Sequence, residues 1–365
     1  MNKVALFIFV LISLAVVSLI AFIVIPEEYL TLSNQSTFEN DLTDSQTAEF
    51  QFLDQPNIPL NEAEQAQSDD AESSQVELIA VGDIMLARSV NTSMIRRNDW
   101  KYPFLQTAEV LQQADLLFGN LESPMGPDCS YTDEGMRFCA NPLSLEGLVF
   151  AGFDVMSLAN NHGYDQGTEG YEFTKEQVSS AGIAPVGFNE TTEIVVSNAN
   201  GGSVKVGFAA FDDTLRSLDL NVVEEKIAEL ATTVDVVIAS FHWGIEYSDQ
   251  PSDRQREIAQ VAAQAGSQLI LGHHPHWVQT VEEIIVPTED SDALNESENK
   301  NPTNRTVVFY SLGNFVFDQM WSQETRTGQV AFITLDKSGV VSYETKTVEI
   351  FDYSQPRFID ASVSN

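Results

Sequence analysis

The chain has 365 residues, and 54 Asp and Glu against 18 Lys and Arg give it a formal net charge of −36. A protein this acidic lacks the basic surface that neutralises phosphates, so its charge disfavours nucleic-acid binding. Its hydrophobic fraction of 43% is that of a globular protein, and its length is enough for one large domain or two ordinary ones. The simplest interpretation of the acidity is solubility, for example in a saline habitat.

The first element is an apolar run over residues 4–25 that contains no charged residue. A helix of this length, at about 1.5 Å per residue, spans about 33 Å, enough to cross the hydrocarbon core of a bilayer. The run is longer than the apolar region of a signal peptide and lacks a small-x-small cleavage site, which favours an uncleaved anchor over a cleaved signal. Lys3 precedes it and the next basic residue is Arg88. The positive-inside rule therefore predicts a cytoplasmic stub at residues 1–3 and an extracytoplasmic remainder in the cell membrane.

Residues 26–75 differ in composition from the rest of the chain. Ser, Gln, Asn, Asp and Glu dominate there and no basic residue occurs, which is typical of a disordered acidic linker. We expect a folded domain over residues 76–352 and a loosely held tail over residues 353–365. Within the domain, Cys129 and Cys139 enclose a polar segment and are expected to form a disulfide outside the cytoplasm, since they lack the spacing of a thiolate metal site.

The predicted elements of the domain change in kind along the chain. Apolar runs that predict buried strands first alternate with amphipathic helices, and strands then predominate. This order predicts two sheets packed on each other with helices outside, an α/β fold. The strands are expected at 77–81, 116–118, 155–159, 204–211, 236–241, 269–271, 278–286, 306–310, 329–335 and 340–350, and the helices at 103–116, 143–151, 169–181, 222–231 and 252–265.

All five histidines lie in short motifs that follow strand-like apolar runs. Three fall within residues 272–276, and the other two are His162 and His242. Open α/β sheets bind ligands at the carboxyl ends of their strands. Further polar side chains are expected at the same ends, namely Asp83, Asn120, Glu122 and Asn161.

Taken singly, these residues have ordinary explanations. An Asp after a strand glycine is more often a turn residue, and a buried His more often satisfies a hydrogen bond. Taken together, they predict one metal site assembled from distant parts of the chain. Carboxylate, amide and imidazole ligands without a thiolate suit Mn, Zn or Fe. We expect one or two ions, and two ions about 3.5–4 Å apart share a carboxylate ligand.

Six short motifs occur in a characteristic order between Glu77 and Ile350. They are Gly82-Asp83-Ile84-Met85-Leu86, Gly119-Asn120-Leu121-Glu122, Leu158-Ala159-Asn160-Asn161-His162, His242-Trp243-Gly244, Gly272-His273-His274-Pro275-His276 and Ser311-Leu312-Gly313-Asn314-Phe315. The series resembles that of the CapA-type capsule-biosynthesis family, which is associated with poly-γ-glutamate capsules and belongs to the calcineurin-like metallophosphoesterase superfamily. The resemblance implies a four-layer α/β-β-α sandwich of the metallophosphoesterase type.

The resemblance also implies a role for each motif residue. His162 resembles the phosphate-facing general acid. His273 is expected to support the metal site, as are Asn120 and Asn160, and Asp165 either orients His162 or is a plain turn residue. The implied metal ligands are Asp83, Glu122, Asn161, His242, His274 and His276.

Two positions depart from the phosphoesterase pattern. The phosphoesterases have Asp-x-His on the first strand, and here Asp83 is followed at the His position by Met85, so the first metal loses an imidazole ligand. Glu122 lies three residues after Gly119 instead of four and carries an extra methylene in place of the bridging Asp. Both departures resemble the CapA type, and they weigh against ordinary phosphoesterase activity.

Three further residues are candidate substrate contacts. Arg88 would bind an anionic group in a bidentate manner, or it is an ordinary surface arginine. Trp243 would line a pocket, or it packs in the core as aromatic residues more often do. Asn314 follows a predicted strand and is expected at the rim of the site.

The sequence thus predicts a membrane-anchored protein that acts outside the cytoplasm in the synthesis, export or attachment of an anionic capsule polymer. The expected chemistry is metal-assisted hydrolysis or transfer on a polymer or phosphate-type substrate. Its expected partners are the membrane and membrane synthase subunits, and no nucleic acid. Two alternatives stand beside it: a non-catalytic accessory subunit of a polymer synthase, and a general secreted metallophosphoesterase.

Overall fold

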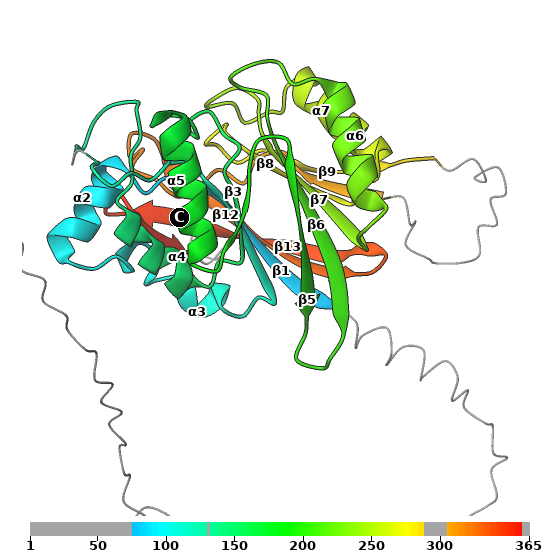
Figure 1. Cartoon of the computed structure of the whole chain (residues 1–365), viewed down its shortest axis with the longest axis horizontal. Helices are drawn as coiled ribbons and strands as arrows, with labels where there is room; N and C mark the ends of the chain where they lie inside the picture. Colours follow the sequence, from blue (N-terminus) through cyan, green and yellow to red (C-terminus); the bar gives the residue numbers. More distant parts are fainter. Residues whose placement is uncertain (1–74, 130–131, 288–304, 360–365) are drawn as a thin grey trace, which may run out of the picture. The chain divides into compact units, whose positions relative to one another are not determined.

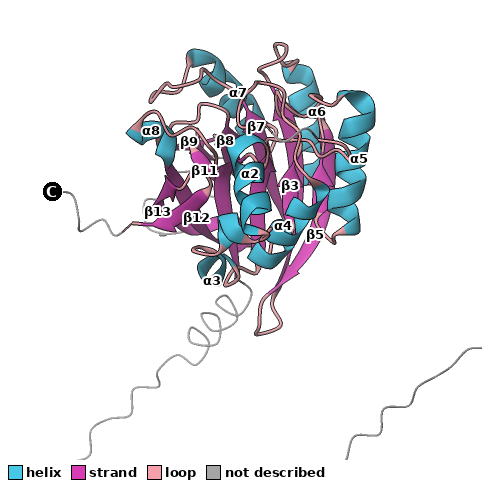
Figure 2. Ribbon diagram, turned by 90° about the vertical axis from the view of Figure 1, so that its left-hand side faces the viewer, coloured by secondary structure: helices cyan, strands magenta, loops and turns pink. Residues whose placement is uncertain are grey.

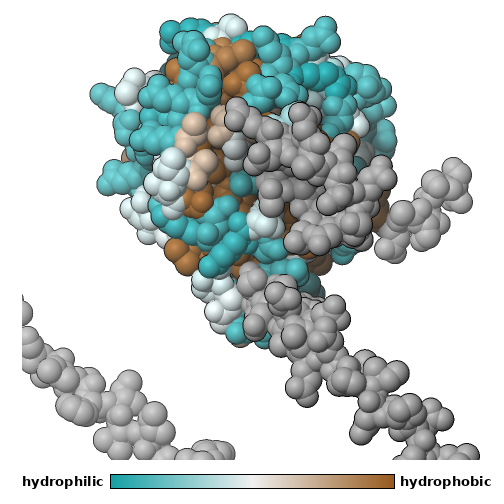
Figure 3. All heavy atoms as spheres, turned by 90° about the vertical axis from the view of Figure 1, so that its right-hand side faces the viewer, coloured by the Kyte–Doolittle hydropathy of each residue, from teal (hydrophilic) through white to brown (hydrophobic). Residues whose placement is uncertain are grey.

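The computed structural model describes residues 75–129, 132–287 and 305–359. The predicted stub at 1–3, the anchor at 4–25 and all of the linker except residue 75 lie outside these ranges. Within the described ranges, no helix is long and apolar enough to span a bilayer. The face of the molecule in Figure 3 is mostly hydrophilic with separate apolar patches, as the high charge leads one to expect.

The first sheet has eight strands in the order β14-β13-β12-β1-β2-β3-β4, with β11 pairing on β1. Strands β1 to β4 run parallel, whereas β12, β13 and β14 join by antiparallel pairs. The strands are β1 (Val76–Ile84), β2 (Leu116–Leu121), β3 (Val155–Ser157), β4 (Ala184–Val186), β11 (Asn314–Val316), β12 (Thr327–Asp336), β13 (Gly339–Phe351) and β14 (Gln355–Phe358).

The second sheet has six strands in the order β5-β6-β7-β8-β10-β9. Its centre, from β6 to β10, is parallel, and β5 and β9 close its two edges with antiparallel pairs. The strands are β5 (Glu190–Ser197), β6 (Ser203–Asp212), β7 (Val236–His242), β8 (Leu269–His273), β9 (Val281–Ile285) and β10 (Arg305–Phe309).

Three apolar cores hold the sheets and helices in four layers. Successive residues of a strand point to opposite faces, so in β1 Leu78 and Ala80 enter the core between the two sheets, while Ile79 and Val81 face a helical layer. Helices α2 to α5 cover the first sheet, and α6 and α7 cover the second (Figure 1). Figure 2 shows α2 and α4 in front of the strands. The order of layers predicted from the sequence is confirmed.

The helices differ from the predicted ones mainly near the first sheet. The helices are α2 (Arg88–Arg97), α3 (Ala108–Leu111), α4 (Leu145–Ala151), α5 (Gly167–Ser180), α6 (Leu220–Ala231), α7 (Asp253–Gln264) and α8 (Gln323–Arg326). The helix predicted over 103–116 is wrong. The chain forms a short 3₁₀ turn and then the four-residue α3, because the Asp115 amide must donate to the carbonyl of Glu77 where β2 begins beside β1. Helix α2 was not predicted, since its sequence is polar and no side chain caps its start.

The tail predicted over 353–365 is also partly wrong. Residues 355–358 form β14, which pairs antiparallel with β13. Asp352 and Tyr353 adopt left-handed backbone angles, with φ of 51° and 61°, and reverse the chain between the two strands. Pro356 fits this strand because β14 lies at the edge of the sheet, where a missing N–H is tolerated.

Candidate metal centre and active site

Parallel pairing places the predicted site residues at one end of each sheet. In the first sheet, Asp83 of β1 is in register with Asn120 of β2. In the second sheet, His242 of β7 is in register with His273 of β8. The motifs follow these strands directly, so their side chains gather where the strand ends of the two sheets meet.

The carboxylate of Asp83 is fully buried and well partnered. Asn120 donates from Nδ2 to Asp83 Oδ1 at 2.9 Å, and the His274 amide donates to Oδ2 at 3.2 Å. The Nδ1 atoms of His273 and His276 each lie 3.3 Å from a carboxylate oxygen. Burial raises the pKa of Asp83, but the two imidazoles outweigh it and hold that pKa well below its usual value. Asp83 is therefore an ionised ligand candidate.

Glu122 is equally buried but has no hydrogen-bond partner for either carboxylate oxygen. His276 Nε2 lies 3.7 Å from its Oε1, and His162 Nε2 lies 4.0 Å from the same atom. Burial, and then the charge of Asp83, raise the pKa of Glu122 well above its usual value. A buried carboxylate without a donor is costly, and a bound cation would satisfy it. Asp83, Glu122 and His276 place ligand atoms within 4.8 Å of one another, so the residues fit a metal ion.

Three more predicted ligands converge beside this group. His242 Nε2 lies 2.9 Å from Asn161 Oδ1 and 3.2 Å from His274 Nδ1. Burial and then the charge of His274 lower the pKa of His242, and burial and then the charge of His276 lower the pKa of His274 to about 4. Both imidazoles are thus neutral at physiological pH, the state that metal ligation requires. All six predicted ligands lie in one cluster.

His162 faces the same cluster from the first sheet's side. Its Nδ1 lies 2.8 Å from Asp165 Oδ2, and its ring stacks on Phe138 with centroids 3.8 Å apart. Asp165 Oδ2 also accepts from the Phe138 amide at 2.6 Å. These contacts favour the orienting role of Asp165 over that of a plain turn residue, because they direct the other ring nitrogen of His162 towards Glu122.

The remaining supporting residues hold the loops in place. Asn160 donates from Nδ2 to Asn120 Oδ1 at 3.2 Å and to the carbonyl of Leu121 at 2.9 Å, and its Oδ1 accepts from the His162 amide. His273 is buried beside Phe118, with ring centroids 6.0 Å apart. These contacts agree with the supporting roles predicted for Asn120, Asn160 and His273.

Two predicted substrate contacts are wrong. Trp243 is fully buried on the helical side of β7, where its Nε1 donates to the carbonyl of Tyr310 at 2.9 Å. His242 faces the site, so the next residue must face away. Asn314 is fully buried as well, and its Oδ1 lies 2.9 Å from His276 Nδ1 while its Nδ2 donates to the carbonyl of Thr325. Asn314 therefore orients His276, a candidate ligand.

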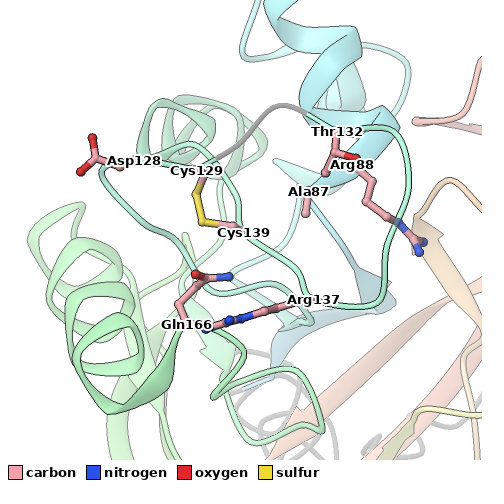
Figure 4. A pocket seen from close by; sticks show the side chains of 8 residues that line it. All are labelled: Ala87, Arg88, Asp128, Cys129, Thr132, Arg137, Cys139 and Gln166. Atoms are coloured by element: carbon pink, nitrogen blue, oxygen red, sulfur yellow. A yellow bond between two sulfur atoms is a disulfide. The ribbon is translucent and has the colours of Figure 1, made fainter.

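Arg88, the third predicted substrate contact, is already engaged. Its guanidinium pairs with Asp318, donates to the carbonyl of Gly135 at 3.1 Å, and lies 4.6 Å from the centre of the Phe138 ring. It lines a cavity of about 270 Å³ together with the disulfide, and Figure 4 shows its guanidinium pointing away from the sulfur atoms. Binding of an anionic group by Arg88 stays a prediction. The predicted disulfide between Cys129 and Cys139 is confirmed.

Sequence reasoning missed Glu246. One of its carboxylate oxygens lies within 4.8 Å of ring nitrogens of His274 and His276. Its charge also contributes to the raised pKa of Glu122, after burial and Asp83. The available signal was an acidic residue four positions after His242, in a loop that follows a strand end.

The fold and the site define an α/β protein of two packed sheets with a candidate metal centre at the strand ends. Residues 77–319 match the family described as bacterial capsule synthesis protein PGA_cap. The chain belongs to this family.

Several curated relatives support the assignment. The chain is 30% identical over 290 residues to the PGA biosynthesis protein CapA of Bacillus subtilis, covering 74% of this chain and 71% of the relative. It is 31% identical over 287 residues to the capsule biosynthesis protein CapA of Bacillus anthracis, covering 72% and 64%. A probable polyglutamine synthesis accessory protein of Mycobacterium tuberculosis is 24% identical over 233 residues, covering 56% and 61%.

Solved structures are more distant. A hypothetical protein from Thermus thermophilus has a TM-score of 0.45 at 13% identity and covers 75% of this chain and 99% of its own. A putative 5'-nucleotidase from Staphylococcus aureus, in complex with alpha-ketoglutarate, has a TM-score of 0.41 at 11% identity and covers 80% and 56%. With TM-scores below 0.5, neither likeness informs the chemistry of this chain.

Proposed function

We propose that this protein acts at the outer side of the cell membrane in making, exporting or attaching an anionic capsule polymer, poly-γ-glutamate by family. Membership in the capsule synthesis family supports the process, and the names of the two Bacillus relatives support the polymer. The apolar run at 4–25 supports the membrane anchor. Membrane synthase subunits are the proposed partners.

The proposed chemistry is metal-assisted hydrolysis or transfer, in a domain of the metallophosphoesterase type. The observation that carries it is Glu122, a fully buried carboxylate whose two oxygens have no hydrogen-bond donor. Divalent ions in the cluster would polarise the bond that is attacked and make water nucleophilic at neutral pH. The side chains that would hold them are Asp83, Glu122, Asn161, His242, His274 and His276.

His162 is the proposed proton donor to the leaving group. Asp165 fixes its Nδ1, so Nε2 faces the cluster, and stacking on Phe138 keeps the ring in this plane. General acid catalysis of this kind contributes about 10²–10⁴-fold to a rate. A chain of net charge −36 also repels an anionic polymer, so bound cations would favour the approach of the substrate as well as the reaction.

The test begins with the metal content of the full-length chain. We expect one or two transition-metal ions per chain by elemental analysis, after loosely bound ions have been exchanged away. His162→Ala should retain these ions and lose polymer-processing activity. A wild-type chain that stays free of metal after incubation with Zn²⁺ and Mn²⁺ contradicts the proposal.

A non-catalytic accessory role is the second candidate. Met85 stands where an imidazole ligand is expected, and it is buried in the helix-side core. The mycobacterial relative is named an accessory protein. In this case the site would hold the polymer or a synthase without turning over a bond, and His162→Ala would support capsule formation as well as the wild type does.

A further inference from the structure

We infer that Glu246 is an additional metal ligand that completes the centre on the side of His274 and His276. The inference rests on the proposed metal-dependent function and goes beyond the six ligands implied by the motifs. Its first support is position, since one Glu246 oxygen lies within 4.8 Å of a ring nitrogen of each histidine. The two histidines are buried, and Glu246 is half-buried at the mouth of the cluster.

The loop that carries Glu246 is built to hold this position. The amide of Tyr247 donates to the carbonyl of Pro275 at 2.8 Å, which ties the loop to the turn between His274 and His276. Gly244 has a φ of +87°, and a Cβ there would lie 2.5 Å from Gln255 Oε1. Tyr247 also adopts a left-handed φ of 61°. Such backbone angles are costly for a residue other than glycine and persist where the surrounding structure requires them.

The second support is the ligand missing at Met85. Met85 is buried among apolar side chains, its amide donates to the carbonyl of Val316 at 2.8 Å, and its sulfur accepts from the Ala87 amide. It therefore faces away from the ligand cluster and supplies no donor to it. Glu246 restores the number of ligands from a different loop. It also brings the carboxylates to three, with Asp83 and Glu122, which shifts the set towards oxygen donors such as Mn²⁺ prefers.

Mn²⁺ binding to the full-length chain in detergent tests the inference. Free Mn²⁺ is counted by its EPR signal during titration, and bound metal by elemental analysis. Glu246→Ala should lose one ion per chain or bind it at least about tenfold more weakly, because loss of even an outer partner of a ligand costs about 10–100-fold in metal affinity. Glu246→Gln keeps the shape of the side chain without its charge, so its Mn²⁺ affinity should lie between those of the wild type and Glu246→Ala. Asp249→Asn is the matched control, since Asp249 is an exposed acid of the same loop, and it should bind as the wild type does.

The outcomes separate this inference from the proposed function. If Glu246→Ala binds the same number of ions with a Kd within about twofold of wild type, Glu246 is not a ligand while the metal-dependent function stands. If the wild type itself binds no Mn²⁺ or Zn²⁺, both are overturned. Circular dichroism of the metal-free variants checks the fold. If Glu246→Ala is unfolded, the isosteric Glu246→Gln is used instead, and a Kd within about twofold of the wild type then overturns the inference.

Discussion

The two sheets contribute different chemistry to one site. The strand ends of the first sheet and the loops after them provide oxygen atoms, from Asp83, Glu122 and Asn161. The second sheet provides mainly nitrogen atoms, from His242 and the turn after β8, and the inferred ligand Glu246 is its one carboxylate. Among the oxygen ligands, the carboxylate of Asp83 accepts hydrogen bonds, whereas that of Glu122 has no donor. On the nitrogen side, burial lowers the pKa of His242 and His274.

This difference shows that neither sheet alone provides partners for all of its buried polar side chains at the site. Asp83 is held by donors that come partly from the second sheet's loop, such as the His274 amide. Glu122 is left with a burial cost that a bound cation would remove, and each neutral imidazole offers the lone pair of one ring nitrogen while the other nitrogen keeps its proton. An ion between the two sheets would satisfy both the carboxylates and the imidazoles. The contributions of the two groups can therefore be tested separately by substitution.

The largest effect should follow from breaking the nitrogen side. His274→Ala combined with His276→Ala removes two ligands, and we expect at least about a hundredfold weaker metal binding, beyond what loss of a supporting contact costs. Elemental analysis of the purified chain measures it. Retention of the wild-type metal content in the double variant would show that the ions bind elsewhere.

The next effect concerns His162, the proposed proton donor. His162→Ala should lower the rate of the metal-dependent reaction by about 10²–10⁴-fold and leave the metal content unchanged. Asp165→Asn keeps the imidazole but weakens its orientation, so it should reduce the rate less and shift the pH profile. Single-turnover rates across pH test this, and an unchanged rate in His162→Ala excludes the role of general acid.

Acid should destabilise the metal-free protein through the nitrogen side. An ordinary His has a pKa of 6.5, whereas the pKa of His274 in the folded state is about 4. Below pH 6.5 the unfolded chain therefore takes up a proton that the folded chain does not. The free energy of unfolding should fall by about 3 kcal/mol from this group between pH 6.5 and pH 4. Urea unfolding of wild type and His274→Gln at several pH values measures it, and parallel curves for the two chains would contradict the assignment.

The smallest effect has the opposite sign and lies on the oxygen side. Glu122→Gln removes a buried carboxylate without a partner, so the metal-free variant should be more stable than wild type by about 1–3 kcal/mol at pH 7.5. Because the pKa of Glu122 is raised well above the ordinary value of 4.5, the folded wild type binds the proton at a higher pH than the unfolded chain does. The gain should therefore shrink as the pH falls towards 4.5, where the unfolded chain binds the proton as well. The same variant should gain less thermal stability from added Mn²⁺. A destabilised metal-free Glu122→Gln would show that Glu122 has a donor in solution.

The convergence of the candidate ligands was predictable because each lies at or shortly after the end of a buried strand, and parallel strands bring such positions together. The direction of Trp243 was also predictable, since it comes directly after His242, the last residue of β7. Glu246 was not, because its position depends on the left-handed angles of Gly244 and Tyr247 and on a backbone bond to Pro275. The role of Asn314 depends on a contact across 38 residues of sequence, which local patterns do not contain.

The disulfide has a consequence for where this protein can work. Cys139 directly follows Phe138, whose ring covers His162 and whose amide contacts Asp165. A covalent link to Cys129 thus limits the movement of the residue that stacks on His162. Chains that mature in a thiol-reducing compartment would carry the same candidate ligands with a less constrained His162, so under the proposed function the oxidation state of the surroundings would affect activity.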